Sequence, residues 1–331
     1  MAVDGPRLRI DVVVPLYNEE QVVGEFHRRL MDVVSTLRRA HVVRICYVND
    51  GSSDGTAAEL AKLAADDADV TVVELSRNFG HQAALTAGLD RADGDVVVTL
   101  DGDGQHPPEL IPQLVDLHRV GYDVVLTQRV AADRTRVKRW TSRAFYRLLS
   151  LISDTPITDG SADYRLVSRQ VLEALRGMRE YHRFLRGMVA WTGFRTVVLP
   201  YTEPARIAGE AKYSLRRMAR FAADATFSFS LVPVGIAVIV GLGFLLLAAA
   251  EAVYVLSFWL TGRQHRLVPG WSSLMFMILI VGAALMIAVG VVGIYVGYIF
   301  QEVKRRPVYV VRAVHGGADD RPPAARDDPR R

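Results

Sequence analysis

The sequence contains one cysteine, Cys46, among its 331 residues. A single thiol excludes a disulfide within the chain and a metal site built from several cysteines. Cys46 lies in an apolar run, where a small buried side chain is its expected role. The N-terminus has no basic segment followed by a long apolar run and a cleavage site, so we predict no signal peptide and a first domain in the cytoplasm.

Several common ligand-binding motifs are also missing. No G-x-G-x-x-G follows an apolar run and no Walker lysine motif occurs, which excludes the usual dinucleotide and P-loop sites. A calcium-binding EF-hand loop starting at Asp101 is excluded because His106 and Pro112 occupy the positions that need glycine and glutamate. The net charge is a modest +4 and no nucleic-acid recognition motif accompanies it, so we predict no nucleic-acid partner.

The sequence does contain a regular alternation of short apolar runs and amphipathic segments. The apolar runs are rich in β-branched residues and show no period of two, which is typical of strands covered on both faces. This alternation predicts an α/β, Rossmann-like fold with a mostly parallel sheet and flanking helices. The predicted strands are 10–16, 42–48, 70–75, 95–100, 122–127, 162–167 and 195–199, and the predicted helices are 19–39, 54–65, 81–91, 108–118 and 181–191.

Polar residues follow four successive predicted strands. The first strand continues into PLYNEE, the second into NDGSSDGT, the third into SRNFG and the fourth into DGDGQ. In open parallel sheets, ligands bind beyond the carboxyl ends of the strands. The sequence therefore predicts a ligand site at this edge of the sheet.

The DGDGQ segment has two interpretations from its residues alone. Asp101 and Asp103 are two residues apart, a spacing that directs side chains to the same face of a strand, and the glycines between and after them leave room for a ligand. Paired carboxylates suit Mg²⁺ or Mn²⁺ together with substrate phosphates, and Gln105 can add a carbonyl oxygen. The alternative is a tight turn in which Asp and Gly have only a backbone role.

The C-terminal third is mostly apolar. Residues 229–250 carry no charge, the apolar pattern continues to residue 260, and 271–300 form a second uncharged stretch. Each is long enough to cross about 30 Å of hydrocarbon, and basic flanks place both termini on the cytoplasmic side. The alternative is a hairpin buried in a soluble protein. We divide the chain into a globular domain (1–213), an amphipathic juxtamembrane helix (214–230), two transmembrane helices (231–300) and a cytoplasmic, partly disordered tail (301–331).

Taken together, these motifs resemble the family 2 glycosyltransferases of the GT-A fold. VVVPLYNEE, VNDGSSDGT, SRNFGHQAALTAGLD and LDGDGQHPPEL carry this resemblance, in this order. DGSADYRLVSRQVLEAL, FLRGMVAWTGFR, RIAGEAKYSLRRM and GIYVGYIFQEVKRRPVYVV are similar to the polyprenyl-phosphate branch, which includes dolichol-phosphate mannose synthases and bacterial bactoprenol glucosyltransferases. The resemblance covers residues 8–312.

The resemblance implies a set of site residues. Those that would bind the donor nucleotide are Pro15, Tyr17, Glu19, Asp50 and Asp101. The metal ligands would be Asp101, Asp103 and Gln105; the catalytic residues would be Asp103 and Asp163, the latter orienting the acceptor or acting as a base. The cationic residues around the donor and acceptor phosphates would be Arg129, Arg139, Arg206 and Lys212. One departure is Ala211, where the family usually has a serine, so a hydroxyl donor to phosphate is missing.

The implied reaction is an inverting, metal-dependent transfer of a hexose from a nucleotide sugar, with UDP-glucose expected, to polyprenyl phosphate. The product would be a lipid-linked sugar donor for cell-envelope glycosylation, made at the inner (plasma) membrane by a chain able to form homo-oligomers. A phosphate monoester is largely dianionic above its second pKa of about 6, so we expect Asp163 to position the acceptor more than to remove a proton.

Three alternatives remain open at this point. The first is a GDP-mannose donor. The second is a processive polysaccharide synthase, although such enzymes usually carry a Q-x-x-R-W motif and more spans than this chain has. The third is a non-catalytic membrane scaffold that binds a sugar nucleotide or a lipid phosphate.

Overall fold

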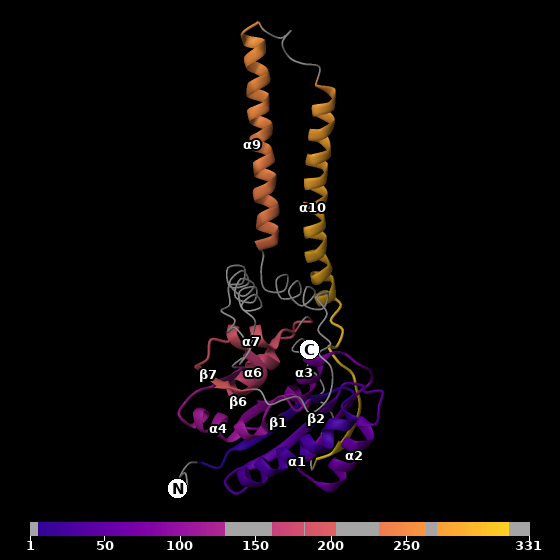
Figure 1. Cartoon of the computed structure of the whole chain (residues 1–331), viewed down its shortest axis with the longest axis vertical. Coiled ribbons are helices and arrows are strands. Elements are labelled where there is room, and N and C mark those ends of the chain that lie inside the picture. The colour runs from indigo at the N-terminus through magenta and orange to yellow at the C-terminus, as the bar shows by residue number, and fades with distance from the viewer. Residues whose placement is uncertain (1–5, 130–160, 182, 203–231, 263–269, 318–331) are drawn as a thin grey trace, which may run out of the picture. The chain divides into compact units, whose positions relative to one another are not determined.

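The computed structural model describes residues 6–129, 161–181, 183–202, 232–262 and 270–317. They belong to two compact units. The first unit holds a sheet with its helices, and the second holds two long helices (Figure 1). The first unit includes residues 307–317, which the predicted division assigns to the tail.

The first unit is built on an eight-stranded mixed sheet in the order β7-β5-β6-β4-β1-β2-β3-β8. The neighbours among β4, β1, β2 and β3 are parallel, as are β5 and β7, whereas β6 runs antiparallel to β4 and β5, and β8 to β3. The sheet is therefore mostly parallel, as predicted. The strands are β1 (Arg9–Leu16), β2 (Val42–Asn49), β3 (Val70–Leu75), β4 (Val96–Thr99), β5 (Val124–Arg129), β6 (Ser161–Ser168), β7 (Thr196–Tyr201) and β8 (Val311–Gly316).

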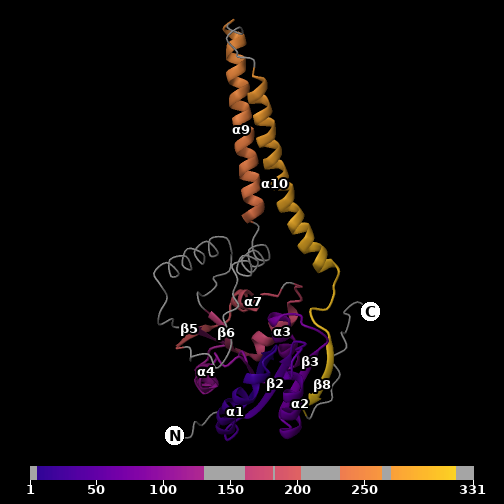
Figure 2. The same ribbon diagram turned by 45° about the vertical axis from the view of Figure 1, so that its right-hand side comes forward.

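Helices cover both faces of this sheet (Figure 2). One face packs against α1 (Glu20–Leu37), α2 (Thr56–Asp66) and α4 (Ile111–Arg119), the last preceded by the short 3-10 helix η1 (Pro108–Leu110). The other face carries α3 (His81–Arg91) and α6 (Arg169–Gly177), and α7 (Leu185–Trp191) packs against α6. This two-sided cover explains why the strands are continuous apolar runs.

Successive side chains of β1 point to opposite faces of the sheet, and each face has its own hydrophobic core. Val12 and Val14 pack with α1 in the larger core. Val13 faces α3, where a Cβ on Gly88 would lie 2.2 Å from Val13 Cγ1. Glycine at position 88 therefore lets α3 approach β1 closely.

The chain returns to the sheet after its last long helix. β8 pairs antiparallel with β3, and the Tyr309 hydroxyl donates to Asp90 Oδ2 at 2.9 Å. The segment predicted as a partly disordered tail, 301–331, therefore contains β8, an edge strand of the sheet. Neither β8 nor α6 was among the predicted elements.

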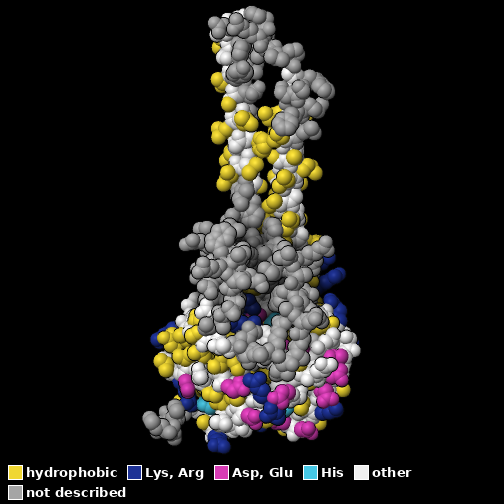
Figure 3. Space-filling model, in the orientation of Figure 1, with side chains coloured by type: hydrophobic (Ala, Val, Ile, Leu, Met, Phe, Trp, Pro, Cys, Tyr) yellow, Lys and Arg dark blue, Asp and Glu magenta, His cyan; other side chains and the backbone are white. Residues whose placement is uncertain are grey.

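The second unit consists of α9 (Val232–Leu260) and α10 (Trp271–Val303), which contact each other. Hydrophobic side chains are exposed along both helices (Figure 3), among them Leu246, Leu274 and Met286. Within the described residues, one segment, Ile280–Val303, has the length and composition to cross a membrane, with a mean hydropathy of 2.4. The two predicted helices are present; two membrane crossings stay a prediction, and the predicted helix 214–230 lies outside the described residues.

Candidate functional site

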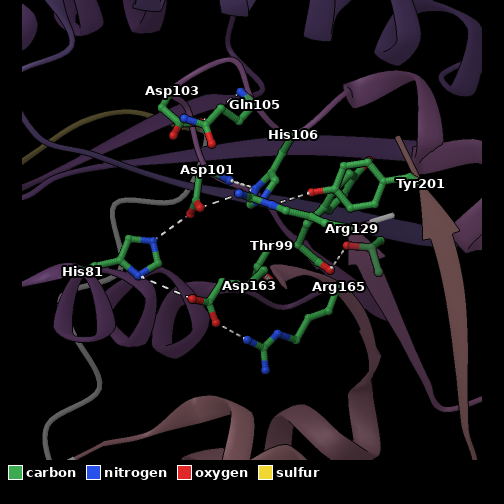
Figure 4. A network of polar contacts seen from close by, with 12 residues as sticks. His81, Thr99, Asp101, Asp103, Gln105, His106, Arg129, Asp163, Arg165 and Tyr201 are labelled. Atoms are coloured by element: carbon green, nitrogen blue, oxygen red, sulfur yellow. Dashed lines mark hydrogen bonds and ion pairs between the residues drawn. The ribbon is translucent and has the colours of Figure 1, made fainter. Parts of the chain in front are cut away.

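Polar residues from several strands meet at one edge of the sheet (Figure 4). β6 runs antiparallel to its neighbours, so its first residues, including Asp163, reach the edge at which β4 and β5 end. Thr99, the last residue of β4, pairs in register with Arg165 of β6, and its hydroxyl donates to the Asp163 carbonyl oxygen at 2.6 Å. The sheet topology therefore brings Asp163 to the strand ends that the sequence singled out.

Hydrogen bonds join the loops after β1 and β2. The Glu19 N–H donates to Thr56 Oγ1 at 2.9 Å, and the Glu20 carboxylate accepts the Gly55 N–H at 2.9 Å. Pro15 is buried beside β2, whereas Tyr17 is 45% exposed. Of the predicted nucleotide residues, Pro15 therefore lies near the end of β1, and Tyr17 and Glu19 lie in the loop that follows it, with Tyr17 accessible to a ligand.

Asp50 connects the loop after β2 with the loop after β3. Its Oδ1 accepts the Phe79 N–H at 2.7 Å and its Oδ2 accepts the Gly80 N–H at 2.9 Å. The side chain is buried, and burial raises the pKa of Asp50 despite these two donors. Asp50 therefore fixes the loop after β2 relative to the loop after β3. Its contact with a nucleotide stays a prediction.

The Asp101–Gln105 segment is a turn. β4 ends at Thr99, so the alternation of side chains along a strand does not apply to Asp101 and Asp103. Asp103 Oδ1 accepts the Gln105 N–H at 3.0 Å, and the Asp101 carboxylate is directed at His81 (Figure 4). Gly104 supports the turn with φ of +78°, a value that favours glycine.

Gly102 has a role that differs from the expected one. A Cβ at this position would lie 2.4 Å from Leu16 Cδ2 and 3.0 Å from Val14 Cγ1. The space next to Gly102 is therefore filled by the side chains of β1, not left open for a ligand. Its small size lets the turn between the two carboxylates pack onto the core.

Gly102→Ala is expected to lower the free energy of unfolding by about 1–3 kcal/mol, because the added methyl group overpacks this contact. Gly177→Ala is the matched control, since nothing lies within 4 Å of a Cβ there. Thermal melting of both variants measures the difference. Equal melting temperatures would contradict the role given to Gly102.

His81, the first residue of α3, lies between two carboxylates. Its Nε2 is 2.7 Å from Asp101 Oδ1, and its Nδ1 is 3.9 Å from Asp163 Oδ2. Burial opposes the charged imidazole, but Asp101 and Asp163 together raise the pKa of His81 to about 9. Burial likewise opposes ionisation of Asp101, yet His81 and His106 lower the pKa of Asp101 to about 2. The pair is thus charged at neutral pH.

Asp163 is held by arginines. Arg186 of α7 forms a bidentate pair with it, Nε to Oδ1 at 3.1 Å and Nη2 to Oδ2 at 2.8 Å, and Arg165 Nη2 donates to Oδ1. Although burial opposes it, these guanidinium groups hold the pKa of Asp163 well below its ordinary value. Gln82 extends the network: its Oε1 accepts the Leu185 N–H at 3.1 Å. An ionised carboxylate in this setting is a weak base and a strong positioning group.

Arg129, at the end of β5, points into the same edge. Its Nε donates to the Tyr201 hydroxyl at 3.2 Å, and its Nη2 lies 3.3 Å from His106 Nε2. Of the predicted phosphate-binding residues, Arg129 lies within the described part of the chain. The others, Arg139, Arg206 and Lys212, lie outside the described residues, as does Ala211.

The turn after β4 carries the types of oxygen atom that a hard divalent cation prefers. Asp101, Asp103 and Gln105 supply carboxylate and amide oxygens from one turn, and Mg²⁺ commonly binds through one or two carboxylates plus substrate phosphates. In the described part of the chain, no group of three or more His, Cys, Asp or Glu side chains is arranged to hold a metal ion. The metal ligands therefore stay a prediction.

Five residues of this edge were not predicted from the sequence: His81, Gln82, His106, Arg165 and Arg186. His81 and Gln82 directly follow the third predicted strand end, and His106 directly follows DGDGQ, so their position was a usable signal. Arg165 and Arg186 gave no such signal, because their contacts with Asp163 depend on the packing of β6 and α7.

The chain is similar in sequence to known glycosyltransferases. The family model "Glycosyl transferase family 2" matches residues 11–176. An uncharacterized glycosyltransferase, sll0501, of Synechocystis sp. is 37% identical over 93% of this chain and 96% of its own. The bactoprenol glucosyl transferase of Shigella phage SfII is 35% identical over 94% of this chain and 99% of its own. Among solved structures, the mannosyltransferase PcManGT of Pyrobaculum calidifontis, in complex with GDP-Man and Mn²⁺, is 20% identical with a TM-score of 0.45, covering 86% of this chain and 87% of that one.

Proposed function

Because the chain belongs to glycosyl transferase family 2, we propose that it transfers a hexose from a nucleotide sugar to a polyprenyl phosphate. Family membership makes the chain a glycosyltransferase, and the polyprenyl-phosphate acceptor is our proposal. The observation that carries the proposal is the edge of the sheet at which Asp101, Asp103 and Arg129 stand next to the buried Asp163. The relatives named bactoprenol glucosyl transferases support the acceptor, since they match the chain along nearly its full length.

The donor diphosphate is expected at the turn after β4. Asp101, Asp103 and Gln105 would hold a divalent metal there, which stabilises the charge on the leaving diphosphate. Arg129 adds a fixed positive charge with hydrogen bonds of defined direction. UDP-glucose is the donor that we propose, with the base and ribose on the loops of Tyr17 and Asp50.

The acceptor phosphate is expected near Asp163. A phosphate oxygen that is already ionised can attack the anomeric carbon directly, on the side opposite the leaving diphosphate, which inverts the configuration. Asp163, ionised and fixed by Arg165 and Arg186, is suited to orienting groups around that attack. Proton removal is not its main task, because its pKa is held well below the ordinary value.

The second unit suits a lipid acceptor. The phosphate head group of a polyprenyl lipid lies at the bilayer surface, and an enzyme that uses it must be retained there. Helices α9 and α10, with their exposed apolar side chains, would do so as two membrane spans. We place both termini and the first unit on the cytoplasmic side of the plasma membrane.

The transfer rate is expected to rise with pH up to about 6 and then level off, because the acceptor phosphate becomes dianionic there. Asp163 does not contribute to this rise, since it is ionised throughout. The measurement is kcat/KM for the acceptor between about pH 5 and 8. A phosphonate acceptor, with its higher second pKa, should shift the rise upward, whereas a rise at the same pH with both acceptors would assign the titration to the protein.

The test of the function uses membranes that contain the full chain. They are incubated with polyprenyl phosphate and, one at a time, radiolabelled UDP-glucose, GDP-mannose and other UDP-sugars. Label in the lipid extract with UDP-glucose is the expected result. Label from GDP-mannose alone would correct the donor, and nucleotide-sugar binding without any lipid product would favour a scaffold.

A further inference from the structure

His106 is a fully buried imidazole, 0% exposed, to which the proposed reaction gives no role. It directly follows Gln105 and lies between the turn after β4 and Arg129 (Figure 4). A buried polar ring needs partners for its nitrogen atoms, so each contact of this ring has an energetic consequence. Both of its nitrogen atoms face groups that the proposed function places at the donor diphosphate.

The first contact is with the turn. The Asp101 N–H donates to His106 Nδ1 at 2.9 Å, and the same nitrogen lies 3.5 Å from Asp101 Oδ2. The imidazole therefore fixes the residue at which the turn begins. A ring that tilted away would leave the Asp101 N–H without this acceptor, and the Asp101 carboxylate would be held by His81 alone of these two histidines.

The second contact is with the arginine. His106 Nε2 lies 3.3 Å from Arg129 Nη2. Two tyrosines confine the ring, since the ring centroids of Tyr164 and Tyr201 are 5.3 and 6.4 Å away. The Tyr164 hydroxyl donates to the Pro107 carbonyl oxygen at 2.9 Å, and the Tyr201 hydroxyl accepts from Arg129 Nε. The ring is thus packed in one position between its polar partners.

The two contacts compete for one proton on the ring. A neutral imidazole has one nitrogen that accepts and one that donates. In one neutral form, Nδ1 accepts the Asp101 N–H and the ring holds the start of the turn after β4. In the other, Nε2 accepts from Arg129 Nη2 and the Nδ1–H is directed at the Asp101 carboxylate. A protonated ring would set its Nε2–H against the Arg129 guanidinium group, which is also a donor. In either neutral form the ring, confined by Tyr164 and Tyr201, fills the space between Asp101 and Arg129.

We propose that His106 is a positioning residue that fixes Arg129 relative to the Asp101–Gln105 turn. The Arg129 guanidinium group and the carboxylates of the turn are thereby directed at the same diphosphate. The inference rests on the proposed function, because it takes the diphosphate to bind at this turn. It adds a residue that acts through Asp101 and Arg129 without touching the substrate.

Two substitutions separate the two contacts. His106→Asn can keep a polar atom near the Nδ1 position, and His106→Gln can keep one near the Nε2 position. His106→Ala removes both, and His118→Asn, at a histidine of α4 that contacts the Tyr122 carbonyl oxygen, is the control. All variants are made in the full chain. The measurements are Mn²⁺ binding by electron paramagnetic resonance, UDP-glucose binding at saturating Mn²⁺ by calorimetry, and thermal melting.

The expected results differ between the two substitutions. His106→Asn should keep Mn²⁺ binding within about two-fold and weaken UDP-glucose binding about 10-fold, the low end for a partner that orients a ligand group. His106→Gln should weaken Mn²⁺ binding about 10-fold and keep UDP-glucose binding within about two-fold. His106→Ala should weaken both.

Two outcomes would overturn the inference alone: identical binding profiles for the Asn and Gln variants, or wild-type binding of both ligands by His106→Ala with only a lower melting temperature. If His106→Ala fails to fold, the comparison of Asn with Gln still decides. A wild-type protein that binds neither Mn²⁺ nor any nucleotide sugar would overturn the proposed function as well, so the two failures are distinguishable.

Discussion

Asp103→Asn is expected to lower kcat/KM for sugar transfer about 10³-fold, which corresponds to roughly 4 kcal/mol of lost transition-state stabilisation. The substitution is close to isosteric. The asparagine oxygen can still accept the Gln105 N–H that Asp103 Oδ1 accepts at 3.0 Å, so the turn keeps its shape. What is lost is one negative charge that would hold a metal at the donor diphosphate. The measurement is steady-state transfer from UDP-glucose at several Mn²⁺ concentrations.

The control for this substitution is Asp116→Asn. Asp116 is exposed on α4, so the same change in charge is made on a residue that is not part of the candidate site. Its transfer rate and its dependence on Mn²⁺ should match the wild type. Full activity of Asp103→Asn at every Mn²⁺ concentration would refute the metal assignment.

Asp163→Asn is expected to lower the free energy of unfolding by about 3 kcal/mol, or roughly 6–12 °C in melting temperature for a domain of this size. Arg165 is 3% exposed and pairs with Asp163, so the neutral amide leaves a buried guanidinium group without its counter-charge. Arg186 loses its bidentate partner at the same time. Transfer to the lipid should also fall, because the groups that orient the acceptor are no longer fixed.

This destabilisation should depend on pH. The folded-state pKa of Asp163 is held well below its ordinary value of 3.8, so the stability that the carboxylate contributes is present above that value and is lost as the pH falls below it. The difference in unfolding free energy between wild type and Asp163→Asn is therefore full at neutral pH and shrinks in acid. Denaturant titrations at neutral pH and at about pH 3 measure it.

A double substitution separates stability from function here. Asp163→Asn combined with Arg165→Met removes the buried charge together with its partner, which should restore most of the stability. Transfer should remain low, since Asp163 is still absent. If the double variant regained transfer, Asp163 would have only a structural role. If Asp163→Asn alone melted like the wild type, the buried pair would not contribute as argued.

Local sequence signals predicted most of the sheet, but not all of its elements. The parallel strands are continuous apolar runs, and such a run can be recognised in the sequence without knowing which strands pair with it. Arg169–Gly177 has buried residues at Val171, Leu172 and Leu175, a helical spacing that was present in the sequence and was not used. β8 begins within the β-branched run VYVVRAV at 308–314, which was likewise present and was not used; its place beside β3, far away in the chain, is set by pairing alone.

The candidate site was predicted by position rather than by contact. Polar residues at successive strand ends located the edge correctly, since parallel strands bring their ends together. The partners of those residues could not be derived in the same way. His81 between Asp101 and Asp163, and Arg186 on Asp163, depend on how α3 and α7 pack. Gly102 was given the wrong cause, because its neighbours on β1 are visible only in the folded chain.

Lipid-linked sugar formation by the purified 331-residue chain tests the proposed reaction most directly. Wild type and Asp103→Asn are compared, each with radiolabelled UDP-glucose, polyprenyl phosphate and Mn²⁺. Wild type is expected to move the label into the lipid extract as a single glucosyl lipid, and Asp103→Asn is expected to form almost none. No lipid product from wild type with any nucleotide sugar, or equal product from both proteins, would contradict it.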